Sequence, residues 1–514
     1  MDRPKICLTL TGKTIDEDLR ILDKYRKYVD IAELRADFLE QEERLKVREF
    51  PAKAHIPCIL TVRRRIDGGQ FVEGEASRTT LFARALAFAD SDQSKNFDYV
   101  DFEEDFNVQS LIDAALAFGI KIIRSVHSME EPVKNIASRL ESLRSTGLEI
   151  PKIAFMPKTL KDVEDLFEEA KALNDNNHIL IAMGPLGTVS RILSAKLKNY
   201  LTFVSAPENS ENTKAIGQLD PVVMNDVYHF SSLDQSTKIY GITGWPLAVT
   251  SSPALHNEGY KLNKMNAVYV PLPAENFSEA FSFADAVGIE GMSVTVPHKE
   301  KVLECVENQS DKVTLIGASN TIVKKDGQWK CYNTDIGGFT KALQEFLGCK
   351  NLRGKKVAII GAGGASAAIA ASVKLLKGKA CIFNRTVRKA RLLAERFGFK
   401  YAALSSDSVK MLNKYSQIII QTTSIGMNAK EPYSAKDDPL WFYDFSGKEK
   451  VFDIVYVPAE TPVMKRARES GCLCCNGYNM LKYQGYEQFE LFTGKPYEFY
   501  KGFFDDSVIN TEDE

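Results

Sequence analysis

Short apolar runs alternate with longer amphipathic segments along the first half of the chain. Each run is too short for a helix and is bounded by polar turn residues, which is typical of buried strands. The segments between the runs repeat their apolar positions with the period of a helix, for example over 108–118, 133–145 and 161–173. The predicted strands are 6–10, 29–34, 58–63, 99–102, 121–126, 152–156, 179–183 and 200–204.

About eight strand–helix units in a little over 200 residues favour a (β/α)8 TIM barrel, with a flat doubly wound sheet as the competing layout. A barrel predicts that reactive side chains gather at the carboxyl ends of its strands. The predicted strand ends carry Glu33, Arg35, Arg63 and His127, and Arg191 follows a predicted turn at 184–187. Each of these has an ordinary alternative, such as a solvated charge or a structural histidine, so the pattern matters more than any one residue.

Lys152 begins one of the predicted strands, in the apolar run 151–156. Burial removes water from an ammonium group, lowers its pKa and frees some neutral amine. A neutral amine in a pocket is what imine chemistry on a ketone requires. The alternative is a lysine that reaches from the strand start to solvent. A lysine, a histidine and several arginines around one cavity predict an anionic ketone substrate and proton abstraction beside an imine.

The second half contains a nucleotide-binding pattern. An apolar strand at 356–360 runs into the sequence GAGGAS at 361–366, and an alanine-rich helix follows. A glycine turn in that context places a pyrophosphate at a helix N-terminus. Ser366 stands where the strict fingerprint has glycine or alanine, which weakens the motif. After the next strand, Arg385 replaces the acid that would bind an NAD ribose, and Arg388 and Lys389 follow, so the sequence predicts NADP.

A smaller α/β segment, 238–336, precedes this unit, and the polar stretch 231–238 predicts a domain boundary. Within the segment, Lys299 follows a predicted strand and Asp335 starts a predicted helix. Such a pair can transfer protons at a hydroxyl group. Equally, Lys299 can be a surface lysine and Asp335 a helix cap. Spacing does not decide between these interpretations.

Composition excludes several classes of function. The 514 residues suffice for more than one domain, with 44% hydrophobic and 26% charged residues. A net charge of -2 and the absence of long basic or apolar runs argue against nucleic acid or membrane as partners. Nine scattered cysteines suggest reduced thiols, no metal site and a cytoplasmic location. No targeting segment is evident at the N-terminus, although a plastid remains possible if a transit peptide has been removed.

The chain resembles two known enzyme families joined end to end. The first half is similar to a type I 3-dehydroquinate dehydratase and the second to a shikimate dehydrogenase, as in the bifunctional enzymes of plants and some bacteria. The motifs of the first half are Glu33-Leu34-Arg35, Thr61-Val62-Arg63, Ser125-Val126-His127, Pro151-Lys152-Ile153-Ala154 and Val189-Ser190-Arg191. Those of the second half include 293–299, Ala318-Ser319-Asn320-Thr321, Asn333-Thr334-Asp335, 361–366, Asn384-Arg385-Thr386 and 479–484.

The dehydratase resemblance implies that Lys152 forms an imine with the ketone of 3-dehydroquinate and that His127 moves the protons. The implied substrate contacts are Glu33, Arg35, Arg63, Asp67, Arg191 and Gln218. Asp67 replaces the glutamate that usually orients the histidine. Lys214 replaces a serine of the family, and Ser205 or Thr213 are possible substitutes for it. The implied product is 3-dehydroshikimate.

The dehydrogenase resemblance implies that Lys299 and Asp335 are the catalytic pair, with Thr250, Ser252, Asn320 and Gln484 around the substrate ring. Thr250 stands where a serine is usual. The implied contacts to NADP are Gly361, Gly363, Gly364, Ala365, Ser366, Asn384, Arg385, Thr386 and Arg388. NADPH-dependent reduction would then give shikimate.

The resemblance also implies domain limits. They are a dehydratase barrel at 1–232, a substrate-binding domain at 237–336 to which a C-terminal helix at 478–506 returns, and an NADP-binding Rossmann domain at 337–477. Oligomeric state does not follow from the sequence, and a monomer is compatible with it. Three alternatives stay open: a second activity on quinate, a non-catalytic regulator built from these domains, and an aldolase barrel fused to another dehydrogenase.

Overall fold

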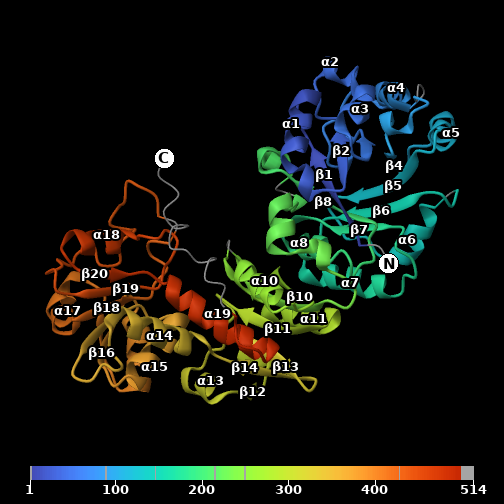
Figure 1. Ribbon diagram of the computed structural model, residues 1–514. Coiled ribbons are helices and arrows are strands. Elements are labelled where there is room, and N and C mark those ends of the chain that lie inside the picture. Colours follow the sequence, from blue (N-terminus) through green and yellow to red (C-terminus); the bar gives the residue numbers. More distant parts are fainter. Residues whose placement is uncertain are drawn as a thin grey trace. The chain divides into compact units, whose positions relative to one another are not determined.

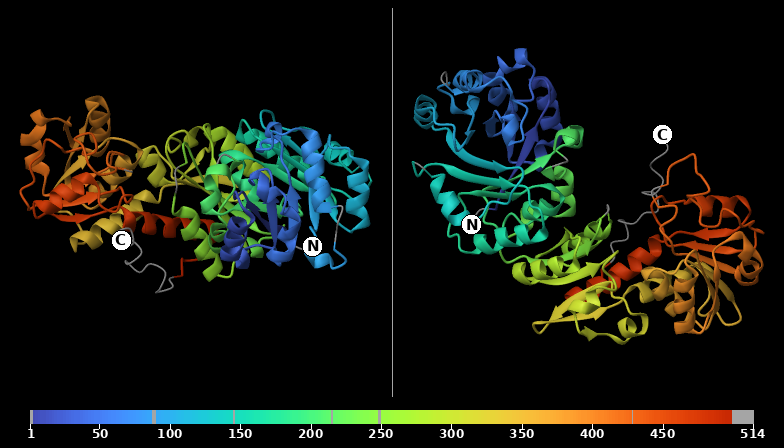
Figure 2. Two further views of the ribbon diagram at one scale, coloured as in Figure 1. Left: turned by 90° about the horizontal axis from the view of Figure 1, so that it is seen from above. Right: turned by 180° about the vertical axis from the view of Figure 1, so that it is seen from behind.

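The computed structural model describes residues 3–86, 90–144, 146–213, 216–247, 250–427 and 429–498. By its internal contacts the chain divides into two compact units, one ending at Ile289 and the other beginning at Glu290. The first unit is coloured blue to green and the second yellow to red in Figure 1, and Figure 2 shows the same elements from two further directions. Each unit is described by itself below.

Eight parallel strands form a nearly closed barrel in the first unit, as the sequence predicts. Their order in the sheet is β7-β6-β5-β4-β3-β2-β1-β8. The register places Glu103 beside Ser125 and Ser125 beside Lys152, so these positions form one row across three strands. The strands are β1 (Lys5–Leu10), β2 (Ile31–Arg35), β3 (Cys58–Thr61), β4 (Tyr99–Glu103), β5 (Lys121–Ser128), β6 (Ile150–Phe155), β7 (Ile179–Ala182) and β8 (Leu201–Ser205).

Helices follow the barrel strands and begin at recognisable caps. The Thr14 side chain accepts from Glu17 N at the start of α1, and Thr159 and Asp162 form a capping box at α7. The turn predicted at 184–187 is instead the first turn of α8, where Pro185 is compatible with a helix start. The helices are α1 (Ile15–Tyr25), α2 (Gln41–Arg44), α3 (Phe50–Ala54), α4 (Glu75–Leu86), α5 (Gln109–Ala117), α6 (Ile136–Ser142), α7 (Leu160–Lys171), α8 (Gly184–Ile192) and α9 (Ser210–Thr213).

The first unit extends beyond the barrel into a strand–helix–strand–helix segment. It consists of β9 (Lys238–Gly244), α10 (Ser252–Leu262), β10 (Ala267–Pro273) and α11 (Phe277–Val287), and β9 and β10 pair in parallel. Helix α11 packs on the barrel helix α7, where the rings of Phe167 and Phe283 meet edge to face at 5.7 Å. The boundary predicted at 231–238 therefore lies inside this compact unit.

The second unit begins with a small sheet and the helices that flank it. Strand β13 pairs antiparallel with β11 and with β14, and β12 pairs parallel with β14. Its elements are β11 (Ile289–Val294), α12 (Val302–Cys305), β12 (Asn308–Gln309), α13 (Asp311–Ile316), β13 (Thr321–Lys325), β14 (Gln328–Tyr332) and α14 (Asp335–Leu347). Helix α19 (Tyr478–Thr493) lies against α14 (Figure 1). The helix predicted over 478–506 thus ends at Thr493, because Gly494 turns left-handed at φ 72°; 499–506 lie outside the described residues.

A parallel sheet with Rossmann topology completes the second unit, in the order β17-β16-β15-β18-β19-β20. Apolar side chains pack on both of its faces, which fits the continuous apolar runs of its central strands. Among the described residues, no helix combines the length and hydropathy of a membrane span. The elements are β15 (Lys356–Ile360), α15 (Gly364–Leu375), β16 (Lys379–Asn384), α16 (Val387–Phe397), β17 (Lys400–Ala403), α17 (Val409–Tyr415), β18 (Ile418–Gln421), β19 (Lys450–Asp453), α18 (Pro462–Glu469) and β20 (Leu473–Cys475).

Candidate active sites

A narrow cavity of about 60 Å³ lies at the barrel strand ends. It brings together every barrel residue that the sequence proposes for the site. Apolar side chains, Phe203 and Ile216 among them, fill the wall between the polar groups. The proposed residues in its lining are Glu33, Arg35, Arg63, Asp67, His127, Lys152, Arg191 and Gln218.

Lys152 lies on β6 with only 4% of its surface exposed, so it does not reach to solvent. Its ammonium nitrogen is 2.9 Å from Asp101 Oδ2 and 4.5 Å from the centre of the Phe203 ring. Asp101 contacts the candidate site and was not proposed from the sequence. Its position on β4, two residues before Glu103, repeats the spacing of Glu33 and Arg35 on β2 and was the available signal.

Asp101 is a buried carboxylate that contacts two cations of the cavity lining, Arg63 and Lys152. Arg63 Nη2 donates to Asp101 Oδ2 at 2.8 Å, and Ser125 Oγ donates to Oδ1 at 2.5 Å. Burial alone would raise the pKa of this carboxyl, but the charges of Arg63 and Lys152 outweigh it and hold the pKa below its usual range. Asp101 is therefore a carboxylate that balances two buried cations.

His127 faces Arg63, with 2.8 Å between Nδ1 and Arg63 Nη1. A guanidinium can only donate, so Nδ1 accepts and the neutral ring carries its proton on Nε2. Burial, followed by the charges of Arg63 and Lys152, lowers the pKa of His127 well below its ordinary value of 6.5. In the described residues Asp67 makes no hydrogen bond to His127; it accepts from Arg64 Nε at 2.7 Å.

Arg191 and Gln218 line the cavity and have buried polar atoms without hydrogen-bond partners in the described residues. Arg191 donates from Nη2 to Ile216 O at 2.7 Å, while its Nε and Nη1 find no partner among the described residues. Burial lowers the pKa of Arg191 to about 10. Gln218 donates to Thr9 Oγ1 at 3.1 Å, and its Oε1 is likewise unpartnered. A buried guanidinium with two open donors predicts an anionic group, such as a carboxylate, as its ligand.

Glu33 and Arg35 are held by neighbours that fix their orientation. Glu33 accepts from Thr9 Oγ1 at 3.1 Å and from Thr61 Oγ1 at 2.8 Å. Arg35 makes a two-pronged pair with Asp37, at 2.9 Å and 2.8 Å. Fixed polar groups of this kind discriminate between substrate orientations without rearranging.

Lys299 and Asp335 meet in the second unit. Lys299 Nζ is 2.6 Å from Asp335 Oδ2, at the first residue of α14. Asn320 Nδ2 donates to the other carboxylate oxygen of Asp335 at 2.9 Å and lies 3.4 Å from Gln484 Oε1. Four residues proposed from the sequence are therefore assembled into one polar cluster.

Gln488 supports this cluster and was not proposed from the sequence. Its Nε2 donates to Asn320 O at 3.2 Å and to Thr321 Oγ1 at 2.9 Å, and its Oε1 accepts from Ser293 Oγ at 2.9 Å. Gln488 follows Gln484 by one helical turn on α19, so the i, i+4 spacing was the available signal.

The glycine-rich loop after β15 is tightly packed on one side and open on the other. Gly361 adopts φ 119°, and a Cβ there would lie 2.5 Å from Thr422 Oγ1. Ser366 Oγ accepts from Gly363 N at 3.0 Å and meets Thr422 Oγ1 at 2.7 Å. The serine that departs from the strict fingerprint therefore closes the loop onto Thr422, the residue after β18. A Cβ at Gly363 would meet nothing within 4 Å, so the loop is open on that side.

Basic side chains follow the next strand of the Rossmann sheet. Arg385, Arg388 and Lys389 are exposed, and none of them forms an ion pair within the described part of the chain. Asn384 Nδ2 donates to Thr386 O at 3.1 Å and shapes the turn before α16. The loop and these cations fit a dinucleotide that carries a ribose phosphate.

Known proteins share this arrangement in sequence. Residues 6–235 match the type I 3-dehydroquinase family, 242–322 the shikimate dehydrogenase substrate binding domain, and 341–434 the shikimate/quinate 5-dehydrogenase family. The bifunctional 3-dehydroquinate dehydratase/shikimate dehydrogenase, chloroplastic, of Arabidopsis thaliana is 32% identical over 96% of this chain and 82% of its own length. The chain belongs to the bifunctional 3-dehydroquinate dehydratase/shikimate dehydrogenase family.

Other relatives of the family match the second half. The shikimate dehydrogenase (NADP+) of Thermococcus kodakarensis is 38% identical over 52% of this chain and 94% of its own length. A crystal structure of a shikimate dehydrogenase in complex with NADP+ is 33% identical, covers 52% of this chain and 93% of its own, and has a TM-score of 0.47.

The chain departs from the family pattern at three residues, and the structure describes two of them. Asp67 lines the barrel cavity but pairs with Arg64. Thr250 donates to Ser252 Oγ at 3.1 Å, and both lie in the first unit, whereas Lys299, Asp335, Asn320 and Gln484 lie in the second. Lys214 lies outside the described residues.

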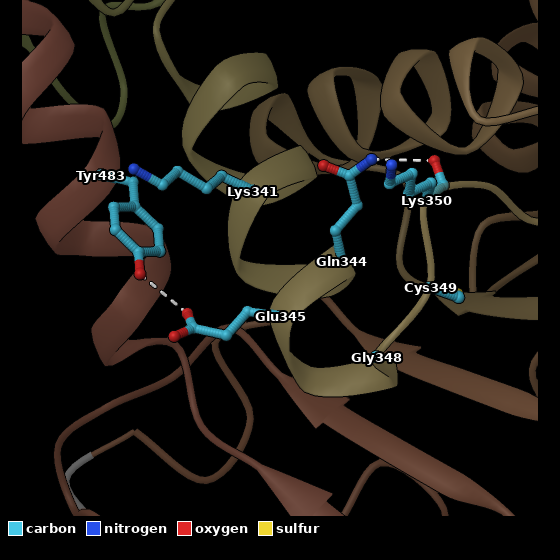
Figure 3. A pocket seen from close by; sticks show the side chains of 7 residues that line it. All are labelled: Lys341, Gln344, Glu345, Gly348, Cys349, Lys350 and Tyr483. Carbon is cyan, nitrogen blue, oxygen red and sulfur yellow. Dashed lines mark hydrogen bonds between the residues drawn. The ribbon is translucent and has the colours of Figure 1, made fainter.

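A wider hollow of about 460 Å³ lies beside α14 and α19 (Figure 3). Its polar groups satisfy one another. Tyr483 donates to Glu345 at 2.8 Å, Lys341 Nζ lies 4.3 Å from the centre of the Tyr483 ring, and Gln344 donates to Lys350 O at 2.8 Å. Among the described residues, none of the side chains that line this hollow has a buried polar atom without a partner, unlike Arg191 in the barrel cavity.

Proposed function

We propose that the barrel site dehydrates 3-dehydroquinate to 3-dehydroshikimate and that the second site reduces this product to shikimate with NADPH. The observation that carries the proposal is the placement of Lys152. Its amine is buried in a cavity with His127 and with a guanidinium that has two open donors. Imine chemistry on an anionic ketone needs these three groups together.

In the proposed dehydration, Lys152 passes one ammonium proton to the carbonyl oxygen, its amine attacks C3 and water leaves, which gives a protonated imine. His127 takes the C2 proton, and the electron pair moves into the protonated imine to give an enamine. The enamine then expels the C1 hydroxyl, which leaves as water with a proton from His127. Hydrolysis of the imine releases 3-dehydroshikimate and restores Lys152. The single lone pair of His127 Nδ1 accepts from Arg63 in this structure. Arg63 must therefore move away before Nδ1 can take the C2 proton.

The other cavity residues hold the substrate in this proposal. Arg191 binds the carboxylate through its two open donors. Gln218, with its free Oε1, accepts from a ring hydroxyl, and so does Glu33, which shares Thr9 Oγ1 with Gln218 as a neighbour. Arg35 and Asp67 complete the polar rim.

At the second site, Lys299 and Asp335 transfer the proton at the reacting oxygen, and Asn320 and Gln484 orient the ring. Thr250 and Ser252 are proposed as further ring contacts. When bound, NADPH supplies the hydride. The proposed cofactor contacts are Gly361, Gly363, Gly364, Ala365 and Ser366 at the pyrophosphate, and Asn384, Arg385, Thr386 and Arg388 at the 2′-phosphate. The open loop and the unpaired cations support them.

The proposal includes the domain limits 1–232, 237–336 and 337–477, with helix 478–493 completing the second domain. The family matches at 242–322 and 341–434 lie inside the second and third ranges, and the match at 6–235 passes the first limit by three residues. A reducing, cytoplasmic setting is also proposed, and the nine free cysteines support it.

Borohydride trapping tests the imine. Reduction in the presence of 3-dehydroquinate should add product mass to the peptide that carries Lys152. The Lys152→Ala variant should lose the adduct and the dehydration but keep NADPH-dependent reduction of 3-dehydroshikimate. Lys158→Ala is the matched control, because its exposed ammonium pairs with Glu131 outside the cavity, and it should keep the adduct. An unlabelled Lys152 peptide in an active preparation would refute the mechanism.

A further inference from the structure

Arg78 and Glu103 are two buried charged residues that do not line the barrel cavity. They continue the series of ion pairs that begins at Lys152. We propose that Arg78 is a positioning residue, which acts through Glu103 and the Val62 carbonyl to fix Arg63 and thereby His127 and Lys152. This inference rests on the proposed dehydration and deepens it, because it names residues that set the geometry of that reaction without touching substrate.

Arg78 holds Arg63 from two directions. Its Nε donates to the carbonyl of Val62, the residue before Arg63, at 2.7 Å. Its Nη2 donates to Glu103 Oε2, and Arg63 Nη1 donates to Glu103 Oε1 at 3.3 Å. The main chain and the side chain of Arg63 are therefore both tied to one guanidinium on α4.

The buried charges alternate in sign from α4 to the reactive amine. Arg78, Glu103, Arg63, Asp101 and Lys152 follow one another as ion pairs, with side chains between 0% and 5% exposed. The row contains three cations and two carboxylates, and Arg78 at its end also pairs with Glu75, whose side chain is 55% exposed. Buried charges are weakly screened, so a change at one end is transmitted to the other.

Arg78 decides how strongly Glu103 attracts Arg63. With Arg78 present, Glu103 shares its charge, and Arg63 keeps 2.8 Å contacts to Asp101 Oδ2 and to His127 Nδ1. Without Arg78, Glu103 would have Arg63 as its ion-pair partner. A carboxylate favours a two-pronged pair with a guanidinium, and such a pair would draw Arg63 away from His127 and Asp101.

Arg124 provides a matched control within the same wall. It is also buried, and its Nη1 donates to the backbone carbonyls of Glu103 at 3.2 Å and Phe106 at 2.8 Å. Within the described part of the chain it pairs with no carboxylate of the row. Loss of Arg124 should therefore disturb the wall without redirecting Arg63.

The test compares Arg78→Gln, Arg78→Lys and Arg124→Gln in the full chain. Arg78→Gln should lower kcat for dehydration about 10- to 100-fold, because a displaced Arg63 no longer holds the Asp101–Lys152 pair in place and a misplacement of about 1 Å can cost that much. Arg78→Lys keeps the positive charge but lacks the planar set of donors of a guanidinium, so its kcat should lie between those of Arg78→Gln and the parent. Reduction of 3-dehydroshikimate should stay at the parent rate.

The titration midpoint of the His127 imidazole, followed by NMR, is the second measurement. The charged groups that face His127 are Arg63, Lys152, Asp101 and Arg35. Withdrawal of Arg63 removes a positive charge and should raise the midpoint in Arg78→Gln, while Arg124→Gln should leave it at the parent value. This readout does not require dehydratase activity, so failure of the proposed reaction would not hide the result.

Two outcomes would overturn the inference. One is an unchanged kcat and an unchanged His127 midpoint in folded Arg78→Gln. The other is an equal effect of Arg78→Gln and Arg124→Gln on kcat and midpoint, because that would show a general loss of packing. If the parent chain did not dehydrate 3-dehydroquinate but Arg78→Gln still raised the His127 midpoint, the proposed function would be refuted and the positioning role would stand.

Discussion

At the scale of single residues, the chemistry of the barrel site depends on the groups that contact the Arg63 guanidinium. Its guanidinium contacts Asp101, His127, Ser125 and Glu103, so it sets both the charge balance at the amine and the tautomer of the imidazole. A lysine in its place would offer one compact charge and could not serve these directions together. Arginine is therefore required here for its geometry as much as for its charge.

The pKa of His127 gives a prediction at this scale. Burial and the charges of Arg63 and Lys152 disfavour the imidazolium, so the ring should remain neutral as the pH falls below 6.5. An NMR titration should show a midpoint below that value. Arg63→Gln removes one of the positive charges and should move the midpoint upward. A parent midpoint at or above 6.5, or a downward shift in the variant, would contradict this account.

At the scale of elements, the strands present their functional groups through alternation. Positions 33 and 35 on β2 and positions 101 and 103 on β4 share a face, because side chains two apart point the same way. Parallel pairing then aligns Ser125 with Lys152 and Glu103 with Ser125. Strand alternation and register therefore place Asp101, Glu103 and Lys152 on one side of the sheet, and a slip by one residue would turn these side chains to the other side.

The glycine turn after β15 supplies a prediction about an element. Gly361→Ala should raise the KM for NADPH about ten-fold, because a Cβ at φ 119° is strained and would lie 2.5 Å from Thr422 Oγ1. Thr422 cannot easily withdraw, since it donates to Ile360 O at 2.7 Å and contacts Ser366. Kinetics with 3-dehydroshikimate would measure the change, and dehydration should be unaffected.

Gly354→Ala is the control for backbone strain alone. Gly354 also has a positive φ, 78°, but a Cβ there would meet nothing within 4 Å. Its variant should keep the parent KM for NADPH. Equal effects of the two substitutions would show that the contact with Thr422 is irrelevant.

The sequence patterns predicted the helices and strands better than they predicted the contacts between side chains. The eight barrel strands appear as predicted because each is a short apolar run. The segment at 184–187 is helical although its glycines suggested a turn, since Pro185 fits a helix start. Asp101, Glu103 and Arg78 escaped notice because an acid or arginine in a strand or helix is usually solvated. Only the folded barrel shows that all three are buried against one another.

At the scale of the whole molecule, the side chains that the structure brings into contact at each proposed centre belong to one compact unit. The described lining of the barrel cavity ends at Gln218, inside the first unit. Lys299, Asp335 and the glycine-rich loop all belong to the second. A substitution at one centre should therefore leave the other intact, because additivity holds for sites without shared partners.

Mixing two inactive variants tests this independence. Lys152→Ala should lack dehydration and Lys299→Ala should lack reduction, so neither alone should form shikimate from 3-dehydroquinate and NADPH. The mixture should form it, because 3-dehydroshikimate released by one chain is the substrate of the other. NADPH absorbance and identification of the product would follow the reaction. If each variant kept its remaining activity and the mixture still produced no shikimate, transfer through solution would be excluded, and the two centres would have to work within one chain.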